Sequence, residues 1–361
     1  MSVVLVLNAG SSSLKYALFG PGQPPGHRER GASASDADLR HQLDAVVERV
    51  NAGGETLEAV GHRVVHGGPK HVRPERVTAA LLDDLRAISP FDPQHLPAQI
   101  SIMQHLLARF PQVPQIACFD TAFHADLPRV SRVLPIPRKY EAQGIRRYGF
   151  HGLSYAYLVE ELRRLGALPS RVVLAHLGSG CSLAAVKDGR SVDTTMAFTP
   201  SAGIPMSRRS GDLDPGLAAF LAHSEGMTPD QFQEMTSSRS GLLGISETSA
   251  DVRDLLKAEA DDPRAAEALE IFCYTVRKTV GAYAAALGGL DALVFSGGIG
   301  ERSPVLRERI CRGLEFLDVR LDPARNAANE PVISGGRAAV RVIRTDEEAQ
   351  IAGAVREILN P

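Results

Sequence analysis

Residues 3–19, VVLVLNAGSSSLKYALF, consist of an apolar run, a short turn of small residues and a second apolar run. Two apolar runs joined by such a turn are typical of a β-hairpin. The pattern returns at residues 171–186, RVVLAHLGSGCSLAAV, where the turn is Gly178-Ser179-Gly180. This internal repeat predicts two domains that share one plan.

Strands and helices alternate through the rest of the chain. Short apolar runs predict buried strands at residues 59–65, 115–119 and 292–295. Apolar residues at helical spacing predict helices at residues 78–88, 98–110 and 269–287. Residues 20–37 are rich in Gly, Pro, Ser and Ala, so we expect a surface loop there. The alternation indicates an α/β fold.

Capping signals predict two helices near the C-terminus. Ser303 and Pro304 are a suitable N-cap and first-turn pair. The apolar residues of that helix would be Leu306, Ile310, Leu314 and Leu317. Thr345 and Glu348 have the spacing of a capping box. The helix that follows would carry Ile351, Val355 and Leu359 on one face.

The composition is that of an ordinary globular protein. The 361 residues include 40 Lys and Arg against 42 Asp and Glu, so the net charge is −2, and 44% of the residues are hydrophobic. These values argue against a disordered or fibrous chain, and the length suggests two domains. A net charge near zero without a long basic run argues against nucleic-acid binding.

Three features predict a soluble, cytoplasmic enzyme that does not bind membranes. No apolar run approaches the ~20 residues needed to cross a bilayer. Residues 1–7 lead straight into an apolar run, without the basic region and cleavage site of a signal peptide. The cysteines lack a C-x-x-C spacing, so we expect free thiols in a reducing compartment and no zinc site. They are Cys118, Cys181, Cys273 and Cys311.

Three turns of small residues follow apolar runs and suit phosphate binding. The turn at residues 8–13 offers successive backbone N–H groups, and Lys15 follows it on a strand, so it is not a Walker A loop. An ordinary serine-rich hairpin would show the same pattern. The turns at residues 178–182 and 297–300 are rich in glycine. Together the three turns suggest a nucleotide held by main-chain amides between two domains.

Charged residues and histidines recur where apolar runs end. Arg63 and Asp120 each end or follow such a run, His151 lies between glycines, and Arg209 lies in a second basic segment. A single residue of this kind usually serves packing or lies on the surface, but α/β proteins bind ligands beyond the carboxyl ends of their strands. The chain lacks G-x-S-x-G, H-E-x-x-H and metal-spaced Cys/His motifs, which weakens the hydrolase and zinc-site interpretations.

The chain resembles the acetate kinases in stretches that occur in the same order along nearly its whole length. These are residues 8–15, 61–68, 119–124, 148–152, 296–301 and 345–348. That family belongs to the actin-like superfamily of sugar kinases and heat-shock ATPases. The resemblance therefore implies two duplicated actin-like (ribonuclease H-like) domains with a ligand cleft between them. The first would comprise residues 1–121 and 347–361, and the second residues 122–346.

The resemblance also implies a reaction. It implies reversible, Mg²⁺-dependent phosphoryl transfer from ATP to the carboxylate of acetate, which gives acetyl phosphate and ADP. The partners would be a short-chain carboxylate and ATP, and the protein would be a homodimer. In-line transfer leaves charge on the phosphoryl oxygens, so catalysis rests mostly on positioning and electrostatic stabilisation. Arginine forks suit this task because they hold carboxylate and phosphoryl oxygens in fixed geometry.

The resemblance assigns the catalytic and metal-binding roles. Arg63 and Arg209 would bind the substrate carboxylate and the phosphoryl group, and His151 would donate a hydrogen bond to the phosphoryl group. Asp120 and Glu347 would position Mg²⁺, since that ion favours carboxylates and retained waters. Asn8 would bind the metal and line the phosphate site.

The resemblance also assigns the binding residues. Arg63 would bind the substrate, and Val65, Phe150 and Pro200 would form the apolar pocket for its methyl group. His95 and His176 are candidates to assist the transfer. The nucleotide would contact Ser11, Ser13, Lys15, His176, Gly178, Ser179, Gly180, Asp251, Arg253, Gly298, Ile299 and Gly300.

Several alternatives stay open. Ser179, Arg208 and Arg302 depart from the family pattern, so pyrophosphate or another donor could replace ATP. Propionate or butyrate could replace acetate, because pockets separate acids that differ by one methylene by only ~1–3 kcal/mol. The alternative of another class is a nucleotide-binding regulatory protein without turnover. The arginines and acids expected of an enzyme are all present, which favours the enzyme.

Overall fold

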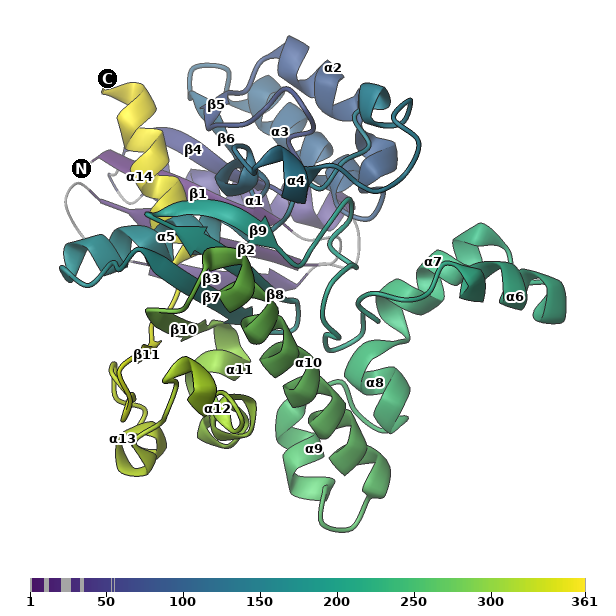
Figure 1. Ribbon diagram of the computed structural model, residues 1–361. Coiled ribbons are helices and arrows are strands. Elements are labelled where there is room, and N and C mark those ends of the chain that lie inside the picture. The colour runs from purple at the N-terminus through teal and green to yellow at the C-terminus, as the bar shows by residue number, and fades with distance from the viewer. Residues whose placement is uncertain are drawn as a thin grey trace. The chain divides into compact units, whose positions relative to one another are not determined.

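The two repeated stretches each form the centre of a β-sheet in the computed structural model (Figure 1). The structure describes residues 2–9, 13–20, 27–32, 36–52, 54 and 56–360. It divides into two units. Unit 1 comprises Met1–Ala125, Phe150–Tyr157 and Asp346–Pro361, and unit 2 comprises Asp126–Gly149 and Leu158–Thr345. The domain limits predicted from the sequence stay a prediction.

Unit 1 is built on a six-stranded sheet with the order β3-β2-β1-β4-β6-β5. Its strands are β1 (Ser2–Ala9), β2 (Ser13–Phe19), β3 (His27–Ala32), β4 (Thr56–Val64), β5 (Glu75–Arg76) and β6 (Gln115–Phe119). β1 and β3 are antiparallel to β2, whereas β4 is parallel to both β1 and β6. β5 pairs antiparallel with β6 at the edge.

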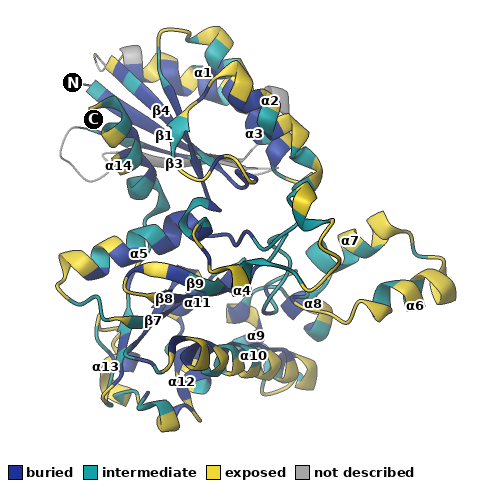
Figure 2. Ribbon diagram, turned by 45° about the horizontal axis from the view of Figure 1, so that its top comes forward, coloured by how far each residue is buried: buried dark blue, intermediate teal, exposed yellow. Residues whose placement is uncertain are grey.

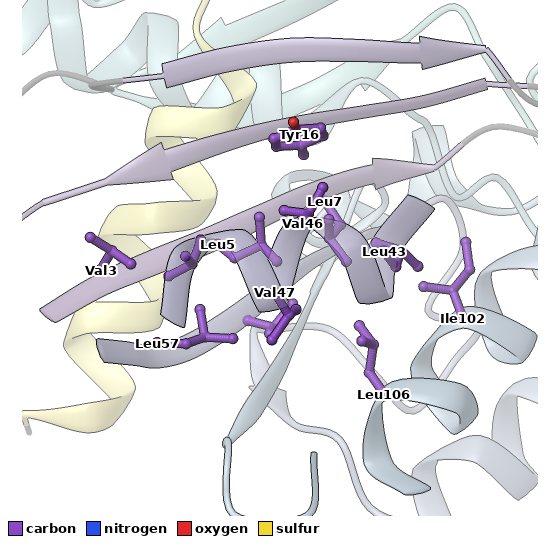
Figure 3. Packing of buried hydrophobic residues seen from close by; sticks show 12 residues of the cluster. Val3, Leu5, Leu7, Tyr16, Leu43, Val46, Val47, Leu57, Ile102 and Leu106 are labelled. Atoms are coloured by element: carbon purple, nitrogen blue, oxygen red, sulfur yellow. The ribbon is translucent and has the colours of Figure 1, made fainter. Parts of the chain in front are cut away.

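Alternation along β1 explains how helices cover both faces of this sheet. Val3, Leu5 and Leu7 belong to one buried cluster, into which α1 (Asp36–Ala52) and α3 (Leu96–Arg109) also pack (Figure 3). Val4 and Val6 belong to a second cluster, formed with α14 (Glu347–Leu359). Successive strand residues point to opposite faces, so one strand supplies both cores. A third cluster holds α2 (Ala79–Ala87) against α3.

Unit 2 is built on a five-stranded sheet with the order β11-β10-β7-β8-β9. Its strands are β7 (Arg171–Leu177), β8 (Cys181–Lys187), β9 (Arg190–Thr194), β10 (Ala292–Ser296) and β11 (Ala339–Val342). β7 and β9 are antiparallel to β8, and β10 is parallel to both β7 and β11. From β9 to β11, the strand order and directions of unit 2 match those of β3-β2-β1-β4-β6 in unit 1. The predicted duplicated α/β plan is therefore confirmed.

The longest helix of unit 2 is α10 (Pro263–Leu287), which Asp262 caps at its start and Gly288, in the left-handed conformation, caps at its end. The other α-helices of unit 2 are α4 (Arg129–Arg132), α6 (Gly216–Glu225), α7 (Pro229–Ser238), α8 (Gly241–Ser246), α9 (Val252–Ala258), α11 (Gly297–Arg302), α12 (Pro304–Cys311) and α13 (Pro323–Ala327). α5 (Gly152–Arg164) begins in unit 1 and ends in unit 2. No helix within the described residues has the length and apolar character needed to span a membrane.

Most predicted elements are confirmed. The predicted hairpins form at β1–β2 and β7–β8, the predicted strands are β4, β6 and β10, and the predicted helices are α2, α3 and α10. The loop predicted at residues 20–37 was wrong in part, because β3 and the start of α1 fall within it. β3 is a polar strand at the sheet edge. It lacks an apolar pattern and forms through main-chain pairing with β2.

Three details near the C-terminus also differ from the sequence predictions. Residues 297–300 form the start of α11 rather than a turn. α12 is capped by Ser303 as predicted, but it ends at Cys311, so Leu314 and Leu317 lie beyond it. The N-cap of α14 is Asp346 rather than Thr345, since its side chain accepts from the amide of Ala349.

We predict opposite effects from two glycine substitutions around α14. A Cβ atom on Gly61 of β4 would lie 2.5 Å from Ile351 and 2.8 Å from Val355 of α14, whereas one on Gly353 would meet nothing within 4 Å. Gly61→Ala should therefore destabilise the protein by ~1–3 kcal/mol, and Gly353→Ala should stabilise it by ~0.5–1 kcal/mol. Urea unfolding followed by circular dichroism measures both. A Gly61→Ala variant as stable as the wild type would contradict the packing described for α14.

Candidate active site

Arg63 of β4 meets polar residues from three other elements of unit 1. Its Nε and Nη2 donate to Asp120 Oδ2 at 3.0 and 2.6 Å, and its Nη1 donates to Asn8 Oδ1 at 3.1 Å. Nη1 also lies 3.5 Å from Glu347 Oε2, on the first residue of α14. Asn8 lies on β1 and Asp120 directly follows β6, so the ends of three parallel strands bring these residues together.

This group of Asn8, Arg63, Asp120 and Glu347, the Arg63 cluster, is charged and mostly shielded from water. The side chains of Arg63, Asp120 and Glu347 are 20, 1 and 13% exposed. Burial opposes the charge on Arg63, but Asp120 and Glu347 outweigh this effect and raise the pKa of Arg63. Burial raises the pKa of Asp120 against the opposing effect of Arg63. Desolvation offsets much of the attraction within a buried ion pair, so the cluster suits ligand binding better than stabilisation.

One oxygen of Asp120 is left over in this arrangement. Asp120 Oδ1 is buried and has no hydrogen-bond partner in the part of the chain that the structure describes. A buried carboxylate oxygen without a partner costs free energy unless a ligand meets it. Mg²⁺ fits here, since it is held by one or two carboxylates and completes its shell with water and substrate oxygens. The described residues contain no group of three or more His, Cys, Asp or Glu that could hold a metal ion.

The backbone next to Asp120 fixes His151. Gly152 N donates to Asp120 O at 2.8 Å, and a Cβ atom on Gly152 would lie 2.1 Å from that oxygen, so only glycine fits. His151 itself is buried and has a φ of +58°, which a residue with a side chain rarely adopts. Tyr155 N donates to His151 O at 3.0 Å. Strained backbone of this kind is common where a functional side chain must be held in place.

Val65 and Phe150, the predicted acyl-pocket residues of unit 1, are buried beside His66. Val65 precedes His66 in the chain, and its amide donates to Gln99 Oε1 at 3.1 Å. The ring of Phe150 packs edge-on against His66, with ring centroids 5.5 Å apart. Phe91 packs edge-on against His66 at 5.8 Å. Phe150 therefore packs in one group with His66 and Phe91, and Val65 is buried next to His66 in the chain, while the roles of Val65 and Phe150 stay a prediction.

His95 pairs with a buried acid. Its Nδ1 lies 2.8 Å from Asp92 Oδ1, and Asp92 is buried. An acid at one ring nitrogen fixes the orientation of a histidine ring and the position of its other nitrogen. The pair therefore holds His95 in one orientation, and its part in the reaction stays a prediction.

The predicted phosphate turn is only partly described. Lys15 on β2 lies opposite Asn8 in the register of the hairpin. Ser11 lies outside the described residues, and of Ser13 only the backbone is described. The main-chain nest expected at residues 8–13 therefore stays a prediction.

The two glycine-rich segments of unit 2 adjoin. β7 and β10 pair in parallel, with Ser296 opposite His176. A Cβ atom on Gly178 would lie 3.7 Å from His176 Nε2 and 3.9 Å from Gly298 N, and Gly178 N donates to Gly180 O. A Cβ atom on Gly298 would meet no atom within 4 Å. The backbone at Gly298 therefore faces open space that a ligand can approach.

Arg209 and Pro200 lie near the turn between β7 and β8. Arg209 Nη1 donates to Pro200 O at 3.3 Å. Met206 N donates to Arg209 O at 2.9 Å, and Ser207 N donates to Ser179 O at 3.2 Å. Pro200 and Arg209 are thus linked to the turn that carries Ser179.

Asp251 and Arg253 bind each other. Asp251 caps α9 and accepts from the amide of Arg253 at 2.8 Å and from its Nη2 at 2.5 Å. The guanidinium lowers the pKa of Asp251 to about 2. The side chain of Arg253 is 83% exposed, so it is accessible to a ligand.

Three residues to which sequence analysis assigns no role hold the backbone of these segments. Gln99 and Thr121 accept from the amides of Val65 and Gly67, which are 34 and 54 residues away in the chain. Glu301 Oε1 accepts from the amides of Gly297 at 3.0 Å and Thr345 at 3.3 Å. Contacts between residues so far apart leave no local pattern, so sequence analysis could not find Gln99 or Thr121.

Known proteins resemble this chain along nearly all of its length. The model described as the Acetokinase family matches residues 27–353. An acetate kinase from Rhodopseudomonas palustris is 41% identical over 97% of this chain and 96% of its own. The structure of a propionate kinase from Francisella tularensis matches with a TM-score of 0.91 and 35% identity over 98% of this chain and 99% of its own. That of Porphyromonas gingivalis acetate kinase matches with a TM-score of 0.89 and 33% identity over 100% of both chains.

Adjacent glycines of α11 should respond differently to substitution. Gly297 has a φ of +75°, and a Cβ atom there would lie 2.6 Å from Leu177 O, whereas Gly298 has open space. Gly297→Ala should destabilise the protein by ~1–3 kcal/mol, and Gly298→Ala, in a helix with open space like that at Gly353, should keep or slightly raise the thermal midpoint. If a nucleotide lies on the open side of Gly298, Gly298→Ala should weaken ADP binding in calorimetry. Equal loss of thermal stability in both variants would contradict the geometry described for α11.

Proposed function

The chain belongs to the acetokinase family, and we propose that it transfers a phosphoryl group from ATP to the carboxylate of acetate. A carboxylate oxygen of acetate attacks the γ-phosphorus of ATP, and the bond from that phosphorus to the β–γ bridging oxygen breaks. ADP leaves with the electron pair of the broken bond, and the products are acetyl phosphate and ADP. Acetate reacts as the anion, so no base has to remove a proton. The reaction is reversible.

The observation that carries this proposal is the hydrogen bonding of Arg63. Its hydrogen bonds to described residues use one hydrogen each on Nε, Nη1 and Nη2. A guanidinium has five N–H groups, so one hydrogen on Nη1, which lies near Glu347, and one on Nη2 make no hydrogen bond to a described residue. Two parallel donors of this kind match the oxygens of a carboxylate or a phosphoryl group. Asp120 and Asn8 hold the fork in place before the substrate arrives.

Other residues would share the electrostatic work. Arg209 would supply a second guanidinium, and His151, held by its backbone, would donate to an oxygen of the transferring group. These donors would stabilise charge that grows on the phosphoryl oxygens in the transition state. The apolar side chains of Val65 and Phe150 would contact the methyl group of acetate. Gly178, Gly180 and Gly298 would let the nucleotide approach the main chain of unit 2.

The metal requirement belongs to the proposal. Asp120, through its free Oδ1, and Glu347 would hold Mg²⁺, with Asn8 beside them. The ion supplies positive charge that neutralises the phosphate oxygens of ATP. We also propose a cytoplasmic location.

A homodimer is part of the same proposal, and the surface of α6 supports it. α6 has no buried residue, and its Phe220 is 64% exposed. Figure 2 shows α6 and α7 largely in the colours of exposed and intermediate residues. Exposed apolar helices of this kind are common at interfaces between protein chains.

Hydroxylamine trapping of the acyl phosphate tests the proposed reaction. Purified protein with Mg²⁺ should form acetyl hydroxamate from acetate and ATP. Propionate and butyrate as acids, and pyrophosphate as donor, run in parallel as the alternatives to the proposed substrates. Product from another acid or donor alone would reassign the specificity. No product from any pair, by folded protein that binds ADP, would contradict the proposed activity.

Arg63→Ala and Arg209→Ala should each lower kcat by ~10²–10³-fold or more, because each removes a donor to the transition state. Arg76, an exposed arginine on β5, supplies the matched control, and Arg76→Ala should keep the wild-type rate. Steady-state kinetics measure the rates, and circular dichroism shows whether the fold is kept. A well-folded Arg63→Ala variant with a normal kcat would remove Arg63 from the mechanism.

A further inference from the structure

A buried arginine lies behind the segment of unit 2 that carries Gly298. Arg307, on α12, has 0% of its surface exposed. Its Nη1 donates to Gly300 O of α11 at 2.8 Å, and its Nε donates to Asn326 Oδ1 at 2.8 Å. Its Nη2 donates to Asn326 O at 3.0 Å and to Asn329 Oδ1 at 2.6 Å.

The partners of Arg307 are unusual for a buried cation. In the described part of the chain, each oxygen that accepts from it belongs to an amide or a peptide group, and none is a carboxylate. A charge buried without a counter-ion costs free energy, and burial accordingly lowers the pKa of Arg307. Packing alone would be served as well by a neutral side chain. The guanidinium is therefore present to donate this set of hydrogen bonds, which a neutral apolar side chain could not make.

Those hydrogen bonds fix α11 at its C-terminal end. α11 spans only Gly297–Arg302, and the last four carbonyls of a helix have no partner within it. Arg307 satisfies the carbonyl of Gly300 and places a positive charge near the negative end of the helix. At the other end, the carboxylate of Glu301 accepts from the amide of Gly297. A glycine-rich helix with poor intrinsic stability is thus held at both ends.

The anchor on the other side of Arg307 is itself fixed. Asn326 is buried, and its Nδ2 donates to Pro304 O at 2.9 Å. Asn329 is exposed and has a φ of +54°, a conformation that asparagine and glycine tolerate. Arg307 therefore joins α11 to α13 and the residues that follow it, and α11 cannot shift without breaking these bonds.

We propose that Arg307 is a positioning residue for the nucleotide. It holds α11 so that the open backbone at Gly298 stays in place to receive the nucleotide, without touching the nucleotide itself. The proposal rests on the proposed function, since that function assigns the nucleotide to this segment. A rigid receiving surface lowers the free energy that ordering would otherwise cost on binding.

The test compares substitutions at Arg307 with one at a second anchoring arginine of the same unit. Arg307→Met removes all four hydrogen bonds, and Arg307→Lys keeps the charge but not the fork. Arg171→Met is the matched control. Arg171 binds Asp291 and Gly288 O near the starts of β7 and β10, whereas Gly178 and Gly298 lie beyond the other ends of these strands. Asn329→Gly is a milder variant that removes one acceptor and keeps the left-handed backbone. All are full-length proteins, measured by ADP calorimetry, steady-state kinetics and thermal denaturation.

The expected result is a selective loss of nucleotide affinity. Arg307→Met should weaken ADP binding and raise the KM for ATP by 10-fold or more, with the KM for acetate and kcat at saturating ATP within 3-fold of the wild type. The ADP affinity of Arg307→Lys should lie between those of the wild type and Arg307→Met. Arg171→Met should lower the thermal midpoint without changing ADP affinity. If Arg307→Met fails to fold, Asn329→Gly tests the proposal in its place. It should bind ADP 2- to 5-fold more weakly and keep the KM for acetate unchanged.

Three outcomes would overturn the proposal. Wild-type affinity for ADP in folded Arg307→Met or in Asn329→Gly would show that the anchor does not matter. Equal losses for ATP, acetate and kcat would show general damage. Absence of ADP binding in the wild type would overturn this proposal together with the assigned nucleotide site. By contrast, weaker ADP binding in Arg307→Met, in a protein that fails to phosphorylate acetate, would support the positioning role and reject only the proposed reaction.

Discussion

The ion pair between Arg63 and Asp120 is the interaction on which the site in unit 1 depends. The two residues are 57 positions apart in the chain, and only the parallel pairing of β4 with β6 brings them within 2.6 Å. A slip of one residue in that pairing would turn Arg63 to the other face of the sheet. The strand register therefore determines the geometry of the Arg63 cluster. The apolar residues that fix this register also fix where the charged side chains lie.

The cores on the two faces of β1 complete this arrangement. The face made by Val4 and Val6 receives α14, and the first residue of that helix is Glu347. Close packing of α14 on Gly61 sets the distance between the helix and β4, and so places a second carboxylate near Arg63. A guanidinium, two carboxylates and an amide can thus be held with little water because rigid apolar layers surround them.

The sequence predicted the α/β plan and the duplication, because apolar runs are local features. Arg63 and Asp120 stood out at the ends of such runs, whereas Asn8 and Glu347 were assigned by the family resemblance. Prediction from the sequence failed where the deciding contact is distant. β3 has no apolar pattern and forms through pairing with β2. Half of the residues of α11 are glycines, which disfavour a helix, and hydrogen bonds from Arg307 and to Glu301 stabilise it. Gln99 and Thr121 act on backbone far along the chain. Such residues become visible only when the packed chain is known.

The most direct test of this account is a crystal structure of the protein with Mn²⁺, ADP, acetate and a planar fluoride mimic of the phosphoryl group. Anomalous scattering would locate the metal ion. The ion should lie next to Asp120 and Glu347, bound directly or through a water molecule, with Nη1 and Nη2 of Arg63 donating to the mimic or to acetate. A metal ion remote from both carboxylates, with Arg63 still bound only to Asp120 and Asn8, would contradict this arrangement.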